Sequence, residues 1–316
     1  MKNPKVSLIV PCYNIEKVCD RFFESLLNQT YNNMEIILVN DGSIDNTEKI
    51  LLKQKIQLEE KGYEVKYIFQ DNKGLGGAIN TGLKNFTGEF LCWADPDDFF
   101  ELNSFELRVK YMQGHPNCAI VSSDAYSVNG DEKQLLSASF PNVGEKKQFE
   151  DLIKKDFLFC PGCHMIRTYD FDKVNPSRDI FEYRRGQNWQ LLMPILYKYD
   201  WSFLNVPLYN YVVYENSMSH IKETYEEKII RNNEHKKVII ETLNRMFISK
   251  EEKDKLLFKI EGIYNKINMG YSYVESNEED YKKYYKICKK FKSVSLKDYL
   301  KLYLIKIKKL HKTFIY

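Results

Sequence analysis

The sequence predicts an α/β fold with a doubly wound, mostly parallel sheet, followed by a helical C-terminal region. Over about the first third of the 316 residues, strand-like apolar runs alternate with helical stretches, an order typical of parallel sheets with crossover helices. Beyond about Ile221 the chain is rich in Lys and Glu, with Leu, Ile and Tyr at helical spacing. We therefore expect an α/β domain over 1–220, with halves 1–100 and 101–220, and a helical region over 221–316.

Composition narrows the class of protein. The chain is 43% hydrophobic and 29% charged, which indicates a globular protein. It contains no run of about eighteen apolar residues, so we expect no membrane-spanning helix. It begins Met1-Lys-Asn-Pro and enters a strand at once, unlike a secretory signal peptide. Seven Cys fit reduced thiols. Together these features predict a cytoplasmic protein.

The N-terminal half should contain four strands with helices between them. Each expected strand is an apolar run that ends in polar residues: 5–10, 34–39, 65–69 and 90–94. Asn14 is the expected N-cap of a helix that starts at Ile15. Asp45 and Glu48 resemble a capping box that opens the second helix, and Gly62 is its expected left-handed C-cap. A flexible glycine loop over 71–77 and a short helix over 78–86 complete the half.

The order of elements is less regular in the second half. Helical spacing predicts helices over 104–114, 145–157 and 187–199, and apolar runs predict strands over 118–126, 164–167 and 201–213. The helix over 187–199 should bend if Pro194 lies inside it.

The strand over 90–94 runs directly into Asp95, Asp97 and Asp98. Three carboxylates within four residues repel one another unless a cation lies between them. A hard divalent cation bound through oxygen is the usual occupant of such a cluster. The alternative is an Asp-rich turn, because Asp and Pro are ordinary turn residues.

The carboxyl ends of the four expected strands should meet at one edge of the sheet, where open α/β folds bind ligands. Tyr13 offers a flat ring for stacking, and Asp41 offers an acceptor for a base N–H. Lys73 and the glycines that follow offer charge and close backbone approach to phosphate. With a cation at the Asp cluster, this set predicts a site for a nucleotide diphosphate.

Four motifs in order resemble the family 2 inverting glycosyltransferases, over roughly residues 5–215. They are Val6-Ser-Leu-Ile-Val-Pro-Cys-Tyr-Asn14, Val39-Asn-Asp-Gly-Ser-Ile-Asp45, the glycine loop ending at Asn80, and Ala94-Asp-Pro-Asp-Asp98. The resemblance implies a Rossmann-like fold of the GT-A type, a nucleotide-sugar donor (usually a UDP-sugar) and Mn²⁺ or Mg²⁺ at an Asp-x-Asp motif.

By that likeness Asp41 would contact uracil, Asp95 the ribose or the metal, and Asp97 the metal. The expected donor-binding residues are Pro11, Tyr13, Asn14, Asp41, Lys73, Gly74, Gly77, Asn80 and Asp95. His220 is a further candidate metal ligand near the diphosphate, although a lone His is more often a surface or hydrogen-bonded residue.

The catalytic base is the main departure from the family. Its usual Glu-Asp pair at the start of a helix corresponds here to Gln187-Asn188, and an amide cannot accept a proton at neutral pH. Asp179 and Glu182 are the nearby carboxylates that could replace it, and we favour Glu182. Gln187 and Asn188 would then bind the acceptor.

Several other patterns carry less weight. Cys160-Pro-Gly-Cys-His164 fits haem attachment, but a turn leading into a strand explains it better. Zinc there would lack a fourth ligand at standard spacing. Ile79 occupies the position of the last glycine in the dinucleotide fingerprint, which makes a dehydrogenase a weak alternative.

The C-terminal tail is strongly basic. From Tyr281 onward there are twelve Lys and one acid, Asp298, so this tail carries +11 and the remainder −8. Six apolar residues follow helical spacing in this tail: Leu296, Leu300, Tyr303, Ile307, Leu310 and Phe314. A basic amphipathic helix predicts binding to an anionic membrane surface. Packing of the stripe on the other C-terminal helices is the alternative, and a nucleic-acid partner is not expected.

The sequence therefore predicts a metal-dependent enzyme that transfers a sugar from a nucleotide sugar to a glycan or lipid-linked glycan. Capsule, cell-wall or lipopolysaccharide assembly is the setting that the resemblance implies. A peripheral position at the inner face of the membrane and an oligomer are compatible with that setting. The alternative from another class is a non-catalytic nucleotide- or glycan-binding module. Gln187-Asn188 favours that alternative, and the intact Asp cluster argues against it.

Overall fold

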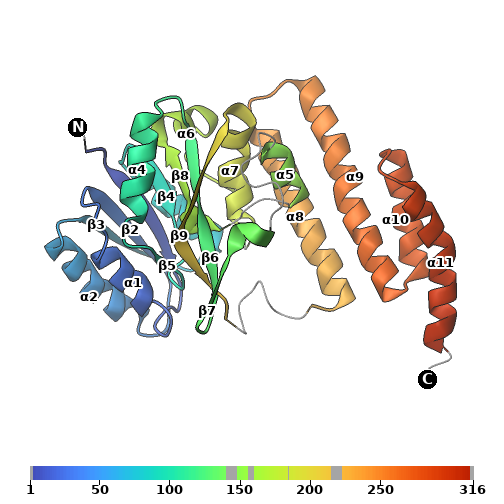
Figure 1. Ribbon diagram of the computed structural model, residues 1–316, viewed down its shortest axis with the longest axis horizontal. Coiled ribbons are helices and arrows are strands. Elements are labelled where there is room, and N and C mark those ends of the chain that lie inside the picture. Colours follow the sequence, from blue (N-terminus) through green and yellow to red (C-terminus); the bar gives the residue numbers. More distant parts are fainter. Residues whose placement is uncertain (1–2, 140–147, 156–159, 184, 215–222, 314–316) are drawn as a thin grey trace. The chain divides into compact units, whose positions relative to one another are not determined.

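The structure is a computed structural model that describes residues 3–139, 148–155, 160–183, 185–214 and 223–313, with side chains described up to 305. The chain divides into two compact units, Met1–His220 and Ile221–Tyr316, and each is described by itself. Figure 1 shows the order of their elements along the chain. The expected fold class, a mostly parallel α/β sheet followed by helices, is confirmed.

A single large sheet forms the first unit, with strand order β3-β2-β1-β4-β8-β6-β9-β5 and β7 paired to β6. Neighbours among β1 to β4 run parallel, so their carboxyl ends lie at one edge. β8 runs antiparallel to both β4 and β6, while β9 runs parallel to β6. The strands are β1 (Val6–Cys12), β2 (Met34–Asp41), β3 (Glu64–Gln70), β4 (Phe90–Trp93), β5 (Phe99–Phe100), β6 (Ile120–Asn129), β7 (Glu132–Leu135), β8 (His164–Arg167) and β9 (Trp201–Val212).

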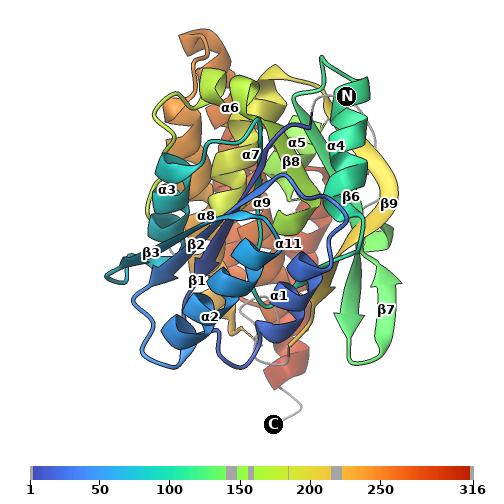
Figure 2. The same ribbon diagram turned by 90° about the vertical axis from the view of Figure 1, so that its left-hand side faces the viewer.

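Helices cover both faces of this sheet (Figure 2). Apolar residues of α1, α2 and α4 pack on the face that carries Leu8, Ile36 and Cys92. On the other face α3 lies so close to β1 that a Cβ on Gly82 would come within 2.3 Å of Ile9. The helices are α1 (Asp20–Leu27), α2 (Thr47–Glu60), α3 (Gly74–Asn85), α4 (Ser104–Gly114), α5 (Gln148–Lys154), α6 (Thr168–Val174) and α7 (Gln187–Lys198).

The start of the first helix was predicted wrongly. Helix α1 begins at Asp20, and Asn14 has a φ of 51° instead of capping a helix. Side chains from the next loop bind the backbone before α1, since Ile15 N donates to Thr47 Oγ1 at 2.8 Å. The backbone N–H of Ile15 is therefore satisfied without a continuous helix from this residue.

Two further N-terminal predictions need correction. The capping box was wrong: Asn46 is the N-cap of α2, and the Asp45 carboxylate instead accepts from Thr47 N at 3.0 Å. The glycine loop was also wrong in part, because Gly74 already begins α3. The expected C-cap is confirmed, since Gly62 follows α2 with a φ of 100°.

The second half differs from prediction mainly in its extent and its additional elements. α5 covers only part of the expected 145–157, and the flanking residues 145–147 and 156–157 lie outside the described part of the chain. β9 is one strand with a register shift against β6 near Asp124, where a strand and turn were expected. The short α6, β5 and β7 were not predicted. Pro194 does lie inside α7.

The second unit is helical, as expected. Capping residues at Thr224, Ser249 and Asn277 start its first three helices, and Thr224 forms a full capping box with Glu227. Its core includes Met269, Tyr281 and Ile305. Within the described residues, no helix has the length and apolarity needed to cross a membrane. The helices are α8 (Tyr225–Arg245), α9 (Lys250–Glu275), α10 (Glu278–Lys290) and α11 (Leu296–Thr313).

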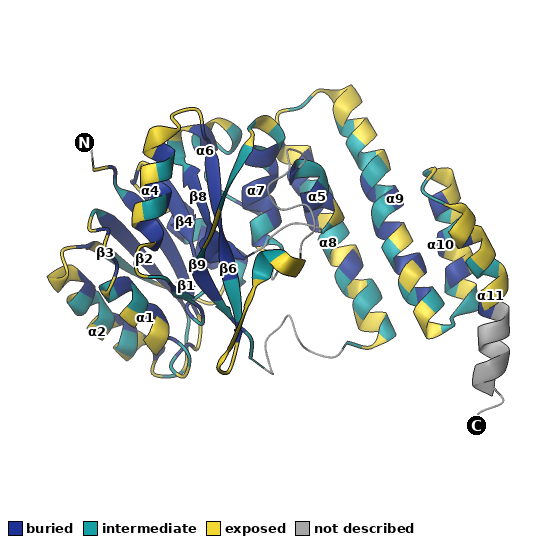
Figure 3. Cartoon of the chain, in the orientation of Figure 1, coloured by how far each residue is buried: buried dark blue, intermediate teal, exposed yellow. Residues whose placement is uncertain are grey.

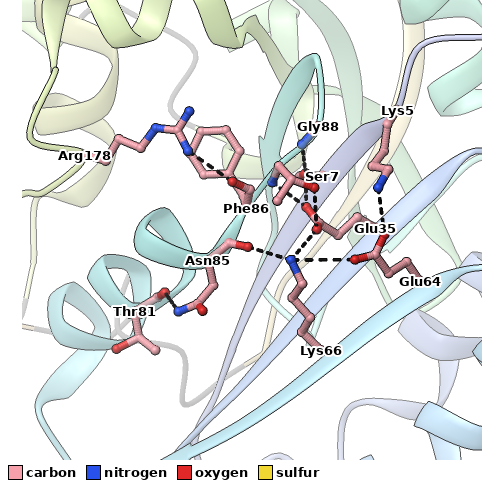
Figure 4. A network of polar contacts seen from close by, with 11 residues as sticks. Lys5, Ser7, Glu35, Glu64, Lys66, Thr81, Asn85, Phe86, Gly88 and Arg178 are labelled. Atoms are coloured by element: carbon pink, nitrogen blue, oxygen red, sulfur yellow. Dashed lines mark hydrogen bonds and ion pairs between the residues drawn. The ribbon is translucent and has the colours of Figure 1, made fainter.

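A buried carboxylate connects the amino ends of β1, β2 and β3, at the edge opposite their carboxyl ends (Figure 4). Glu35 is fully buried and accepts bonds from Ser7, from Thr87 N at 2.8 Å and from Lys66 Nζ at 2.6 Å. Burial opposes ionisation, but the bonds from Lys66, Ser7 and Thr87 outweigh it and lower the pKa of Glu35. Ionised Glu35 therefore stabilises the fold at neutral pH, and this contribution is lost as the pH falls below about 4.5.

Lys66→Met should destabilise the protein at pH 7, because it leaves the Glu35 charge buried without its cation. We expect a loss of about 2 kcal/mol, less than for a fully buried pair, since Lys66 is 30% exposed. Urea unfolding measures the loss, which should shrink as the pH falls and Glu35 becomes protonated, first in the variant because burial then raises its pKa without opposition from Lys66. Lys55→Met, which removes a surface pair with Glu59 on α2, is the control and should cost under about 0.5 kcal/mol. Equal effects of the two variants would contradict this account.

Candidate active site

A cavity of about 720 Å³ opens at the carboxyl edge of β1, β2 and β4. Most of the residues predicted from sequence lie in its wall. Those that line it are Pro11, Tyr13, Asn14, Asp41, Lys73, Gly74, Asp95, Asp97 and Glu182. The cavity therefore brings together an aromatic ring, several carboxylates and the start of a helix.

Asp41, at the end of β2, is held in a fixed orientation. It is 2% exposed, and its Oδ1 accepts from Gln70 Nε2 at 2.7 Å and from Lys73 N at 2.9 Å. The next residue, Gly42, has a φ of 68°, and a Cβ there would come within 2.8 Å of Asn72 N. This glycine lets the two loops approach closely enough for Lys73 N to reach Asp41.

The loop after β1 presents Tyr13 to the cavity, with its side chain about half exposed. Asn14 ties this loop to the one after β2. Its backbone N donates to Ser43 Oγ at 3.0 Å, and its Oδ1 accepts from Ile44 N at 2.9 Å. The positive φ of Asn14 is one that Asn tolerates better than most residues. Asn14 thus supports the position of Tyr13.

The N-terminus of α3 faces the cavity, where backbone N–H groups and the helix dipole favour an anion. Lys73 is the N-cap residue, and Gly74 and Leu75 follow it in the lining. Gly77 is not in the lining. A Cβ on Gly77 would come within 2.3 Å of Lys73 Cβ, so its contribution is to leave room for the lysine.

Asp95, Asp97 and Asp98 gather directly after β4. One carboxylate oxygen from each lies within 4.8 Å of the others. Burial, followed by repulsion from Asp97, raises the pKa of Asp95 to about 7. Burial also raises the pKa of Asp97, and burial with repulsion from both neighbours raises that of Asp98. Without a cation, the cluster therefore resists full ionisation.

The cluster fits a hard divalent cation. Asp98 is 1% exposed; its Oδ1 accepts from Val212 N at 2.8 Å, while its Oδ2 is buried with no hydrogen-bond partner among the described residues. An orphaned buried oxygen beside two more carboxylates is a donor set that Mg²⁺ or Mn²⁺ prefers. The other proposed ligand, His220, lies outside the described residues.

A buried turn supports the Asp cluster through Tyr209. Cys160-Pro-Gly-Cys-His164 forms a short 3-10 turn, Pro161–Cys163, that leads into β8, as expected for a turn motif. A Cβ on Gly162 would come within 2.0 Å of the Tyr209 ring. The Tyr209 hydroxyl in turn donates to the Asp95 backbone oxygen at 3.4 Å. The glycine thus allows Tyr209 to reach the Asp cluster.

The candidate bases differ in their surroundings. Glu182 lines the cavity, whereas Asp179 does not and accepts instead from Ser177 Oγ at 2.6 Å. Gln187 and Asn188 are also absent from the lining. Gln187 Nε2 donates to Tyr183 O at 2.9 Å, and Asn188 Oδ1 accepts from Trp93 Nε1 at 2.8 Å.

Asn80, predicted to bind the donor, is likewise absent from the lining. Its amide bonds both the N–H and the C=O of Ile180.

The sequence did not single out several lining residues: Cys12, Ile15, Val18, Asn72, Leu75, Ala78 and Pro96. Most of them adjoin a predicted site residue, so chain adjacency was an available signal. Ile15 and Val18 belong to or pack against the hydrophobic core as well as lining the cavity.

Comparisons with known proteins identify the family. Residues 7–174 match the family model described as glycosyl transferase family 2. An uncharacterized glycosyltransferase of Rickettsia typhi is 33% identical over 164 residues, which cover 52% of this chain and 48% of that protein. The putative glycosyltransferase EpsH of Bacillus subtilis is 26% identical over 73% of this chain and 67% of its own. The chain thus spans about half the length of the first of these relatives.

Solved structures share the fold at low sequence identity. Staphylococcus aureus TarS 1–349 in complex with UDP-GlcNAc has a TM-score of 0.63 and 18% identity, over 95% of this chain and 79% of its own. The mannosyltransferase PcManGT from Pyrobaculum calidifontis, in complex with GDP-Man and Mn²⁺, has a TM-score of 0.57 and 15% identity over 85% and 72%. The GT-A type of α/β fold is confirmed by these likenesses. Because the family model matches more than half of the residues, from β1 to α6, this chain belongs to glycosyl transferase family 2.

Proposed function

We propose that the protein is a metal-dependent inverting glycosyltransferase that moves a sugar from a UDP-sugar to a glycan or lipid-linked glycan during polysaccharide synthesis. One observation carries the proposal: a single cavity is lined by Asp41, Asp95, Asp97, the start of α3 and Glu182. These groups supply base recognition, charge neutralisation, phosphate binding and proton transfer at one place.

The nucleotide base would stack on Tyr13 and bond to Asp41. Both bonds that Asp41 receives within the described structure fall on Oδ1, which leaves Oδ2 to accept from the ligand. A carboxylate acceptor suits uracil or guanine, which carry a ring N–H, and disfavours cytosine and adenine, whose corresponding ring nitrogens are acceptors. We assign uracil, and a guanine nucleotide is the alternative that a donor panel distinguishes.

The diphosphate would lie between the start of α3 and the Asp cluster. Backbone N–H groups at Gly74 and Leu75 and the charge of Lys73 would bind its oxygens. A divalent ion, when bound by Asp95 and Asp97, would neutralise the charge that develops on the departing diphosphate. Both carboxylates line the cavity wall.

Glu182 would act as the general base. Its carboxylate would take the proton of an acceptor hydroxyl while that oxygen bonds to the anomeric carbon. The bond from that carbon to the diphosphate oxygen would break on the opposite side, which inverts the configuration. A positioned carboxylate of this kind contributes about 10²–10⁴-fold to the rate.

A non-catalytic binding module is the second candidate function. It is favoured by Gln187 and Asn188, the amides that stand where the family carries its acidic pair. Their bonds to Tyr183 O and Trp93 Nε1 show how they can serve the fold without titrating. A binding module would bind UDP and Mn²⁺ but release no UDP from any donor.

The second unit suggests a membrane surface as a further partner. On α11 a face of five large residues is exposed: Leu296, Tyr299, Leu300, Tyr303 and Leu304 (Figure 3). The opposite face packs inward through Ile305, which is fully buried. Asp298, the one acid of the basic tail, is paired with Lys266 at 3.2 Å, so it offsets little of the surrounding lysine charge. Exposed apolar and aromatic side chains beside lysines suit an anionic lipid surface.

Asp97→Asn should abolish metal-dependent transfer, because it removes one carboxylate of the ion site. We expect kcat to fall at least about 10³-fold, in keeping with several kcal/mol from a bound metal. UDP release from a panel of nucleotide sugars with Mn²⁺ measures the loss, and Mn²⁺ titration should show weaker binding. Asp131→Asn, the same change in an exposed turn, is the control. Unchanged Mn²⁺ affinity in Asp97→Asn would contradict the metal assignment.

Glu182→Gln should lower kcat about 10²–10⁴-fold, because the amide cannot accept the acceptor's proton. The affinity for UDP with Mn²⁺, measured by calorimetry, should stay within about twofold. Asp179→Asn tests the other carboxylate and should retain transfer, since Asp179 lies outside the cavity wall. An active Glu182→Gln enzyme would overturn the base assignment.

The proposed lipid contact is tested by flotation of the full chain with vesicles containing phosphatidylglycerol. Leu300→Glu should reduce flotation, because it places a charge within the exposed face of α11. Phe247→Glu, at an even more exposed apolar residue outside α11, is the control. Binding should weaken as salt rises. Equal flotation of the two variants, or a change of oligomeric state in Leu300→Glu alone, would refute a lipid surface.

A further inference from the structure

The segment that carries Glu182 is held by side chains and not by a strand partner. Asn80 Oδ1 accepts from Ile180 N at 2.7 Å, and Asn80 Nδ2 donates to Ile180 O at 2.9 Å. Gln190 repeats the arrangement one residue later. Its Oε1 accepts from Phe181 N at 2.6 Å, and its Nε2 donates to Phe181 O at 3.1 Å. Two side-chain amides thus replace the backbone ladder that a sheet would provide.

The two amides come from different helices, Asn80 from α3 and Gln190 from the first turn of α7. Gln190 is 4% exposed, so its bonds compete little with water. The segment also touches α3 directly. A Cβ on Gly76 would lie 2.9 Å from Tyr183 O and 3.0 Å from Glu182 Cα. Gly76 and Asn80 are four residues apart and therefore lie on one face of α3.

We infer that Asn80 and Gln190 are positioning residues, which fix the backbone on the N-terminal side of Glu182 and so place its carboxylate in the cavity. The inference rests on the proposed role of Glu182 as the base. It also changes the role expected for Asn80. Because both ends of its amide bind Ile180, Asn80 acts on the acceptor side through Glu182 and does not contact the donor.

The geometry explains why amides occupy these positions. Only Asn and Gln side chains present one donor and one acceptor that match a backbone N–H and C=O together. A carboxylate would keep the bond to the N–H and lose the bond to the C=O. Asn80→Asp is therefore a graded variant, and Asn80→Ala and Gln190→Met remove both bonds.

Asn80→Ala and Gln190→Met should each lower kcat about 10–100-fold, the loss expected when a reacting group shifts by about 1 Å. UDP affinity with Mn²⁺ should change less than about twofold, and Asn80→Asp should fall between Asn80→Ala and wild type. Asn85→Ala, on the same helix, removes a side-chain bond to Thr81 O of its own turn and is the matched control. Circular dichroism and thermal unfolding confirm that each variant is folded.

The decisive measurement is a double-mutant cycle. In the Glu182→Gln background, Asn80→Ala should cause no further loss of kcat, because both act through one carboxylate. A further tenfold loss would overturn the positioning role. If Glu182→Gln is inactive while Asn80→Ala and Gln190→Met keep wild-type kcat, the positioning role is wrong and the assignment of Glu182 as the base is retained. If Glu182→Gln keeps wild-type transfer, the proposed base itself is wrong.

Discussion

Repulsion among Asp95, Asp97 and Asp98 is the constraint on which the described site depends. The sheet fixes these carboxylates where β4 ends and holds one oxygen of each within 4.8 Å of the others. Burial raises the pKa values of all three, and repulsion raises those of Asp95 and Asp98 further. Such a cluster gains most from a cation, and a cation there would attract a diphosphate to the same edge. The proposed roles of the other cavity residues follow from that ion and diphosphate: the start of α3 would bind the anion, Asp41 would bind the nucleotide base, and Glu182 would take the proton.

Close approach of backbone segments gives the cavity its shape. Gly42 lets the loops after β2 and β3 meet, Gly77 leaves room for Lys73, and Gly76 lets the segment that carries Glu182 lie on α3. At each position a Cβ would meet another atom at 3.0 Å or less. These glycines therefore matter because they lack a Cβ. The amides of Asn80 and Gln190 bind the backbone of the segment that carries Glu182, because this segment has no strand beside it.

The sequence was sufficient for the parts of the fold that follow local rules. Strands β1 to β4 matched their apolar runs to within about two residues, and Asp41 and Asp97 were found because the carboxyl ends of parallel strands share an edge. The sequence was insufficient where contacts between residues far apart in the chain determine the local structure. Helical spacing at Ile15 was overridden by Thr47, 32 residues away, and the role of Asn80 depends on Ile180, 100 residues away. The local sequence pattern around Ile15 or Asn80 does not indicate these partners. Untested roles, such as those of Gln187 and Asn188, stay predictions.

The bond from Val212 N to Asp98 Oδ1 links the Asp cluster to the last strand of the first unit, 114 residues further along the chain. The motif itself is complete by residue 98, but the groups that orient Asp98 and support Asp95 come from β9. During synthesis on the ribosome, the acidic motif emerges long before the strand that completes it. A divalent ion bound there would therefore find its carboxylates fully supported only after β9 has joined the sheet.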